Sequence, residues 1–235
     1  MRKMQKIWQT LNTMHDVFLI TLFALMILFA VYCVWDSAYL LSSSSDPSLR
    51  NYKPGKSDSV NNSPITEEQI GWLSIDGTGI DYPLMQGEDN YVFLNRDPYG
   101  HFSLSGSIFL DSRSNPDFSD DYSLIYGHHV EFGRMFGALD DFLDEDYLRA
   151  HSRGTLYLGR DGSRRLQLRI IAATRADARD KVYFDPFIGA EETRQIISRA
   201  DVRVSEPTGR LIALTTCVDE STENRLLVFA QIIES

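Results

Sequence analysis

The sequence predicts a mainly β domain, either a closed antiparallel barrel or a sandwich, that follows one transmembrane helix. Three observations lead to this prediction. A run of nineteen residues near the N-terminus carries no charge, and short apolar segments separated by Gly, Asp, Asn and Pro follow it. Only two later segments have the apolar spacing of a helix. Many short strands with few helices are typical of a barrel or a sandwich.

The uncharged run VFLITLFALMILFAVYCVW, residues 17–35, is predicted to be a transmembrane anchor. At about 1.5 Å per residue it nearly spans a hydrocarbon core of about 30 Å. Arg2, Lys3 and Lys6 precede it. The positive-inside rule therefore predicts a single-pass cell-membrane protein, with residues 1–16 in the cytoplasm and the remainder on the extracytoplasmic face. A cleaved signal peptide is the alternative, but the run is long for one and no small-x-small cleavage site follows closely.

The segment after the anchor, residues 36–64, is rich in Ser, Asn and Pro and shows no apolar period. This composition is typical of a spacer. The folded domain is therefore predicted to cover residues 65–235.

Eight segments of that domain are candidate strands. They are residues 72–75, 80–83, 107–110, 123–126, 155–158, 166–172, 211–216 and 226–233. The sequence RLQLRI (165–170) alternates polar and apolar residues, as a half-buried strand does. Helices are predicted at 135–148, where apolar residues recur on one face, and at 191–200, which begins with acidic residues as the helix dipole favours.

The chain has two cysteines, Cys33 in the predicted anchor and Cys217 in the folded domain. This placement argues against a disulfide between them, so the exterior domain has one thiol, which is either buried or used. Cys217 ends the apolar run LIALTT and precedes a polar loop. A side chain at such a point is held rigidly and is still reachable from solvent. A small buried hydrophobic role is the equally open alternative.

Two other catalytic residue types occur at predicted strand ends. His128 and His129 follow a strand in IYGHHV, and adjacent side chains of an extended chain point to opposite sides, so at most one of them faces the pocket of Cys217. Arg225 opens the last strand, and a hairpin loop of about eight residues would return it beside Cys217. A guanidinium there can stabilise a thiolate or an oxyanion, although a surface arginine paired with nearby acids is the alternative.

Composition excludes some functions. The formal charge is −10 at pH 7, whereas nucleic-acid binding needs clustered Lys and Arg, so no nucleic-acid partner is predicted. Two adjacent histidines and one cysteine lack the ligand spacing of a zinc site, so no metal or other cofactor is predicted. An acidic surface suits a partner that carries a free amine.

The motifs together resemble the sortases, bacterial cysteine transpeptidases with the signature TLxTC. YGH follows one strand, ALTTC (213–217) ends another with Ala213 in place of the first Thr, and an arginine opens the next. Three longer segments resemble the class B group. They are GWLSIDGTGIDYPLMQGEDNYVFL (71–94), GSIFLD (106–111) and YGHHVEFGRMFGALDDF (126–142). The resemblance covers residues 65–235.

The resemblance implies a closed eight-stranded β-barrel with a few helices. It also implies that Cys217 is the nucleophile, that His128 is the general acid and base, and that Arg225 stabilises the substrate and the transition state. Five further residues match positions of the substrate groove or flank the cysteine, and the resemblance implies substrate binding for them. They are Asn90, Leu94, Thr215, Thr216 and Asp219.

The implied reaction is cleavage of an LPxTG-like or NPxT-like C-terminal sorting signal of secreted proteins, through a thioacyl intermediate on Cys217. The acyl group then passes to an amine of a lipid-linked peptidoglycan precursor, which anchors the surface protein to a Gram-positive cell wall. A pilin polymerase that uses a pilin lysine is the first alternative. An inactive sortase-like binding module and a hydrolytic cysteine protease are the others, and the presence of Cys217, His128 and Arg225 argues against the inactive module.

Overall fold

The computed structural model describes residues 2–43, 47–55, 63–216 and 224–233. The chain divides into two compact units, residues 1–42 and 43–235.

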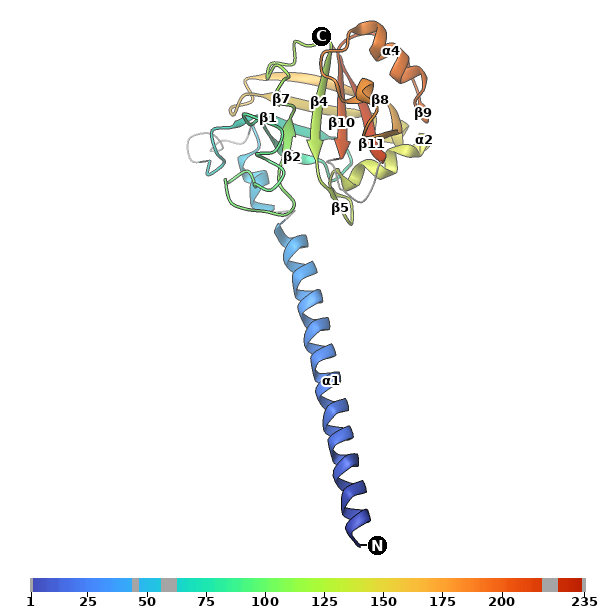
Figure 1. Cartoon of the computed structure of the whole chain (residues 1–235). Helices are drawn as coiled ribbons and strands as arrows, with labels where there is room; N and C mark the ends of the chain where they lie inside the picture. Colours follow the sequence, from blue (N-terminus) through green and yellow to red (C-terminus); the bar gives the residue numbers. More distant parts are fainter. Residues whose placement is uncertain (1, 44–46, 56–62, 217–223, 234–235) are drawn as a thin grey trace. The chain divides into compact units, whose positions relative to one another are not determined.

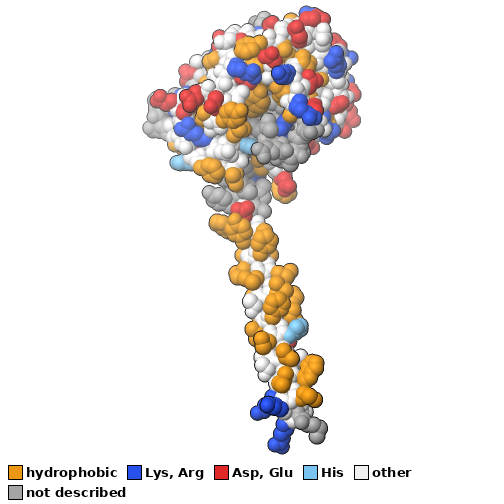
Figure 2. Space-filling model, in the orientation of Figure 1, with side chains coloured by type: hydrophobic (Ala, Val, Ile, Leu, Met, Phe, Trp, Pro, Cys, Tyr) orange, Lys and Arg blue, Asp and Glu red, His pale blue; other side chains and the backbone are white. Residues whose placement is uncertain are grey.

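The first unit is the helix α1 (Arg2–Ser43), which contains the predicted anchor. Its apolar side chains are exposed along the helix, as Figure 2 shows, and Phe29 for example is 69% exposed. A helix that exposes apolar side chains in this way is stable in lipid rather than in water. Among the described residues, no other helix is both long and apolar enough to span a membrane. These features are consistent with a single membrane-spanning helix.

The second unit is a closed β-barrel (Figure 1). Its strands are β1 (Gln69–Ile75), β2 (Asp81–Met85), β3 (Ile108–Leu110), β4 (Tyr122–Gly127), β5 (His129–Val130), β6 (Arg134–Met135), β7 (Arg153–Leu158), β8 (Arg164–Asp177), β9 (Val202–Arg203), β10 (Leu211–Thr216) and β11 (Asn224–Ile233). The order β11-β10-β4-β3-β2-β1-β7-β8 closes because β8 also pairs with β11. Strand β9 adds to β8, and β5 and β6 form a separate hairpin. The predicted eight-stranded barrel is therefore confirmed, and the sandwich alternative is wrong.

The barrel is mixed rather than wholly antiparallel. The pairs β2–β3 and β4–β10 are parallel, while the other six pairs of the ring are antiparallel. Parallel neighbours need a long crossover, which residues 86–107 and 128–210 supply. This arrangement brings the ends of β4 and β10 to the same end of the barrel.

The interior of the barrel is one apolar cluster, and two further clusters lie on its outer face. Strand β4 shows the alternation: Ile125 belongs to the interior cluster, and Leu124 to an outer cluster that also contains residues of α3 (Lys181–Phe184) and α4 (Ala190–Ser198). The second outer cluster joins the barrel to residues 86–107 and to the 3-10 helix η1 (Pro47–Tyr52). We call α3 and α4 the helix cover and residues 86–107 the loop cover.

The helix predicted at 135–148 is interrupted. The structure has the 3-10 helix η2 (Phe136–Leu143) followed by α2 (Glu145–Ala150). The break occurs at Asp144, whose side chain accepts a hydrogen bond from the backbone N–H of Tyr147 and so caps α2. The segment predicted as a spacer contains η1, and its Leu49 is buried in the outer cluster beneath the loop cover.

Candidate active site

The ends of three strands meet at one end of the barrel. Strands β4 and β10 are parallel, and Thr216 lies opposite Gly127. His128 follows β4 directly, and Arg225 is the second residue of β11, which runs antiparallel beside β10. The predicted catalytic residues His128 and Arg225 therefore lie on the same end of the barrel as the end of β10.

The ring of His128 is half-buried and is held by the loop cover. Its Nε2 lies 2.7 Å from the carbonyl oxygen of Leu94, while its own backbone carbonyl accepts a hydrogen bond from the N–H of Phe136 at 3.0 Å. A carbonyl oxygen can only accept, so Nε2 carries a proton. Nδ1 is then the ring nitrogen that can gain or lose a proton.

His129 lies in a different environment. Its Nε2 is 2.7 Å from an oxygen of Asp140, and the side chains of the pair are 48% and 56% exposed. This contact lies on the exposed surface and joins His129 to η2, rather than to the loop cover that holds His128.

Arg225 is a buried cation. Only 3% of its surface is exposed, and in the strand register it lies opposite Ala176 of β8. Arginine is rarely buried unless it is paired or functional. Its burial at the start of β11 places a poorly solvated positive charge at the site end of the barrel.

Thr215 and Thr216 are the last described residues of β10, and both are buried. By the alternation of the strand, Thr215 shares the outer side with Ala213, and Thr216 shares the interior side with Leu214. Cys217 and Asp219 lie outside the described residues, so their expected roles remain predictions.

Asn90 and Leu94, the two predicted groove residues, both belong to the loop cover, but they make different contacts. Leu94 contacts His128 through its backbone carbonyl. The Asn90 side chain donates to Asp111 at 3.0 Å, and its oxygen accepts from the N–H of Ser112 at 2.7 Å.

Sequence reasoning missed Asp111, which contacts the predicted groove residue Asn90, and its partner Arg113. Asp111 is fully buried, and Arg113 binds it with two guanidinium N–H groups at 2.9 and 2.8 Å. One sequence feature could have indicated this pair. The apolar segment GSIFLD (106–111) ends in an aspartate, and an arginine follows two residues later, a pattern that predicts a charged pair after a buried strand. Tyr126, two residues before His128, also donates to Asp111, at 3.2 Å.

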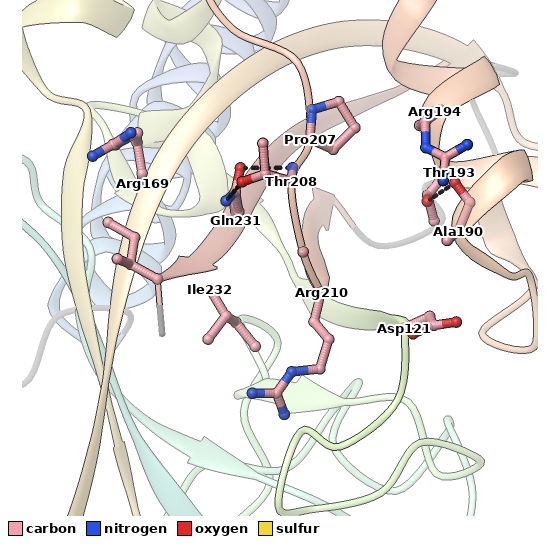
Figure 3. A pocket seen from close by; sticks show the side chains of 12 residues that line it. Asp121, Arg169, Ala190, Thr193, Arg194, Pro207, Thr208, Arg210, Gln231 and Ile232 are labelled. Carbon is pink, nitrogen blue, oxygen red and sulfur yellow. Dashed lines mark hydrogen bonds between the residues drawn. The ribbon is translucent and has the colours of Figure 1, made fainter. Parts of the chain in front are cut away.

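A cavity of about 590 Å³ lies at the other end of the barrel (Figure 3). Its walls include Asp121, which precedes β4, and Arg210, which precedes β10. Strands β4 and β10 begin beside the cavity and run away from it, toward the end of the barrel that carries His128. The cavity is therefore separate from the candidate site. Arg210 donates to the Phe118 carbonyl, and Gln231 bonds Thr208.

Within the described ranges, no group of three or more His, Cys, Asp or Glu is arranged to hold a metal ion.

The chain is similar to known sortases. The family model described as "Sortase domain" matches residues 73–233. Sortase B of Staphylococcus aureus (strain NCTC 8325 / PS 47) is 28% identical over 180 residues, which cover 72% of each chain. Spy0129, a Streptococcus pyogenes class B sortase involved in pilus biogenesis, is 34% identical with a TM-score of 0.65, over 72% of this chain and 94% of that one. Sortase B from the type II pilus of Streptococcus pneumoniae is 33% identical with a TM-score of 0.61, over 77% of this chain and 99% of that one.

Proposed function

The chain belongs to the sortase family as a cysteine transpeptidase of the class B type, and we propose that Cys217, His128 and Arg225 carry its chemistry. The observation that carries this proposal is the parallel register of β4 and β10. It pairs Thr216, which precedes Cys217 in the sequence, with Gly127, which precedes His128. A nucleophile and a base on neighbouring strand ends can share a proton.

In the first half of the proposed reaction, the Cys217 thiolate attacks the carbonyl carbon of the threonine in an LPxTG-like or NPxT-like sorting signal. The tetrahedral oxyanion collapses, the peptide C–N bond breaks, and a protonated His128 gives its proton to the departing amine. The acyl group is then held as a thioester on Cys217.

The hydrogen bond from His128 to Leu94 supports the acid–base role. Because Nε2 is committed to the Leu94 carbonyl, Nδ1 is the atom that gives and takes the proton, and the ring cannot turn without losing that bond. A fixed ring orientation lets one nitrogen exchange protons first with the thiol and then with the amine, as a general acid and base requires.

The burial of Arg225 supports its role as the stabiliser of the oxyanion. A guanidinium that is 3% exposed is weakly screened by water, so its attraction for a developing negative charge is strong. Its planar fork can also hold two oxygens at once.

In the second half, an amine attacks the thioester carbon. A new C–N bond forms, the C–S bond breaks, His128 takes a proton from the amine, and the Cys217 thiolate is regenerated. We infer that the amine belongs to a lipid-linked peptidoglycan precursor, so that the reaction anchors secreted proteins to the cell wall. An enzyme held at the membrane by α1 would meet both the precursor and the emerging substrate.

A pilin lysine is the second candidate acceptor, and one observation favours it. Two structural relatives, a class B sortase involved in pilus biogenesis and a sortase B from a type II pilus, are 34% and 33% identical to this chain, whereas the Staphylococcus aureus structure is 26% identical. The same thioester chemistry would then join pilin subunits by isopeptide bonds.

The proposed topology follows from the first helix. Residues 17–35 span the membrane, residues 1–16 lie in the cytoplasm, and residues 36–64 connect the anchor to a catalytic domain, 65–235, on the extracytoplasmic face. The exposed apolar surface of α1 supports the anchor, and the basic residues at its start support the orientation.

The test uses the full-length chain in detergent with a library of sorting-signal peptides and intact-mass spectrometry. We expect a mass adduct on the wild-type chain, none on Cys217→Ala, and very slow formation on His128→Ala. Addition of a peptidoglycan stem peptide or of a lysine-bearing pilin fragment should then release the adduct, and the faster acceptor identifies the function. An adduct of equal yield on Cys217→Ala would overturn the proposal.

A further inference from the structure

Asp111, directly after β3, is a fully buried carboxylate with an unusually complete set of donors. They are the Arg113 N–H and Nε, both at 2.9 Å, the Arg113 Nη2 at 2.8 Å, the Asn90 Nδ2 at 3.0 Å and the Tyr126 hydroxyl at 3.2 Å. We call Asp111, Arg113, Asn90 and Tyr126 the Asp111 network.

Burial alone would raise the pKa of Asp111, but the hydrogen bonds from Arg113 and Asn90 outweigh it and hold the pKa below its ordinary value. The carboxylate is therefore ionised at neutral pH. The hydrogen bonds that Arg113 donates to Asp111 raise the pKa of Arg113 in turn, so this pair stays charged. Only the carboxylate of this pair is buried, since the Arg113 side chain is 45% exposed, so Arg113 can reach past Asp111 to other parts of the structure.

Arg113 connects this carboxylate to the helix cover. Its Nη2 also donates to the carbonyl oxygen of Phe184, the last residue of α3, at 3.1 Å. The guanidinium carbon lies 5.9 Å from the centre of the Phe187 ring. One guanidinium thus contacts both the end of β3 and the segment between α3 and α4.

Asn90 connects the same carboxylate to the loop cover. Besides donating to Asp111, it accepts from the backbone N–H of Ser112 at 2.7 Å. Gln86 adds a second connection, because its amide donates to the carbonyl oxygens of Asp111 at 3.0 Å and Ser114 at 2.8 Å. The residues after β3 therefore connect the two covers.

Tyr126 lies between the covers, since its ring packs against both outer clusters. It stands two residues before His128 and donates to Asp111. The outer face between the covers therefore leads along β4 to His128, and Asp111 accepts hydrogen bonds from both Asn90 and Tyr126 there.

We propose that Asp111 and Arg113 are positioning residues that hold the two covers at a fixed spacing and so determine which sorting-signal peptide binds. The inference rests on the proposed function, because it takes the face between the covers as the peptide path. Neither residue touches the reacting atoms. Their loss should therefore change peptide KM and peptide choice and leave the bond-breaking step nearly unaltered.

The test compares three variants of the full-length chain in detergent. Arg113→Gln removes the charge, and Arg113→Lys keeps a charge beside Asp111 but lacks the fork that also reaches Phe184. Arg149→Gln is the matched control, because Arg149 binds Glu145 in an exposed pair on α2, with both side chains 56% exposed. Thermal unfolding of each variant is measured alongside.

We expect KM for the peptide to rise about three- to tenfold in Arg113→Gln, which corresponds to the loss of about one hydrogen bond, while kcat stays within about twofold. Arg113→Lys should show a smaller rise and melt close to wild type, which keeps the test valid if Arg113→Gln folds poorly. In a peptide library both variants should accept a broader set of residues, and Arg149→Gln should match the wild type.

A fall in kcat at unchanged KM, or wild-type KM and peptide choice in both Arg113 variants, would overturn the positioning role. Failure of the proposed function looks different, because the wild-type chain itself would then form no thioacyl adduct. A wild-type adduct with unaltered Arg113 variants rejects only the present inference.

Discussion

Replacing Gly106 by alanine is expected to slow catalysis through His128 although Gly106 has no side chain in the site. Gly106 has a φ of +56°, and a Cβ at this position would collide with the carbonyl oxygens of Phe93 and Leu94. These are backbone atoms, so the segment 93–94 has to move. The Leu94 oxygen is the acceptor that holds Nε2 of His128 at 2.7 Å.

The expected size follows from two separate costs. The left-handed backbone of alanine costs about 1–2 kcal/mol and lowers the free energy of unfolding. Loss of a hydrogen bond that holds a charged imidazolium costs about 1.5–3 kcal/mol. If this second cost falls on the transition state, kcat falls about 10- to 150-fold.

Gly133→Ala is the matched control. Gly133 also has a positive φ, +66°, but a Cβ there would have no neighbour within 4 Å. It should therefore lose only the stability that the left-handed backbone costs and keep kcat within about twofold of the wild type.

The assay measures the rate of thioacyl formation at saturating peptide by quenched mass spectrometry, with thermal unfolding in parallel. Gly106→Ala should melt below Gly133→Ala, because its Cβ also displaces residues 93–94, and only Gly106→Ala should lose rate. Wild-type kcat in Gly106→Ala, or an equal loss in both variants, would refute the coupling of Leu94 to His128.

Three further changes test other parts of the structure. Arg225→Lys is expected to lower kcat at least about a hundredfold, because an ammonium lacks the planar fork, and steady-state turnover of a sorting peptide measures this; near-normal turnover would remove Arg225 from the mechanism. Tyr122→Phe removes a buried hydroxyl that donates to the Tyr183 carbonyl at 2.9 Å, so urea titration should show unfolding easier by about 1–2 kcal/mol, and an unchanged midpoint would contradict this. Asp111 has a folded-state pKa below its unfolded value of about 3.9, so the unfolded chain binds more protons in acid. Its contribution to stability is present above about pH 4 and is lost as the pH falls through the folded-state pKa. Melting temperatures of Asp111→Asn should fall less steeply in this acid range than those of the wild type, and parallel curves would argue against the depressed pKa.

The strands of the barrel could be predicted from local pattern alone. RLQLRI (165–170) alternates as a strand with one buried side does, and it lies inside β8. The parallel pairing of β4 with β10 could not be predicted in this way, because the local sequence of residues 122–127 does not indicate a partner almost ninety residues later. The break at Asp144 was missed for a different reason: apolar spacing continues across it, and the cap is a single polar contact.

In the candidate site, too, local sequence predicted some features and missed others. The position of His128 at a strand end could be predicted because its motif follows an apolar run, whereas its contact with the Leu94 backbone depends on the course of a long loop. The contacts of the Asp111 network were missed because three separate segments, at 90, 111–113 and 126, supply its members. Asp111 and Arg113 look like ordinary surface polar residues until the strands pair.

The closure of the barrel by β11 has a consequence for when the enzyme can first act. This last described strand inserts between β8 and β10, and it also carries Arg225. Chain synthesis proceeds from the N-terminus, so the barrel stays open and lacks its buried guanidinium until residues 224–233 have been made. Nascent or C-terminally clipped chains would therefore be inert, and activity should appear in refolding at the same rate as ring closure.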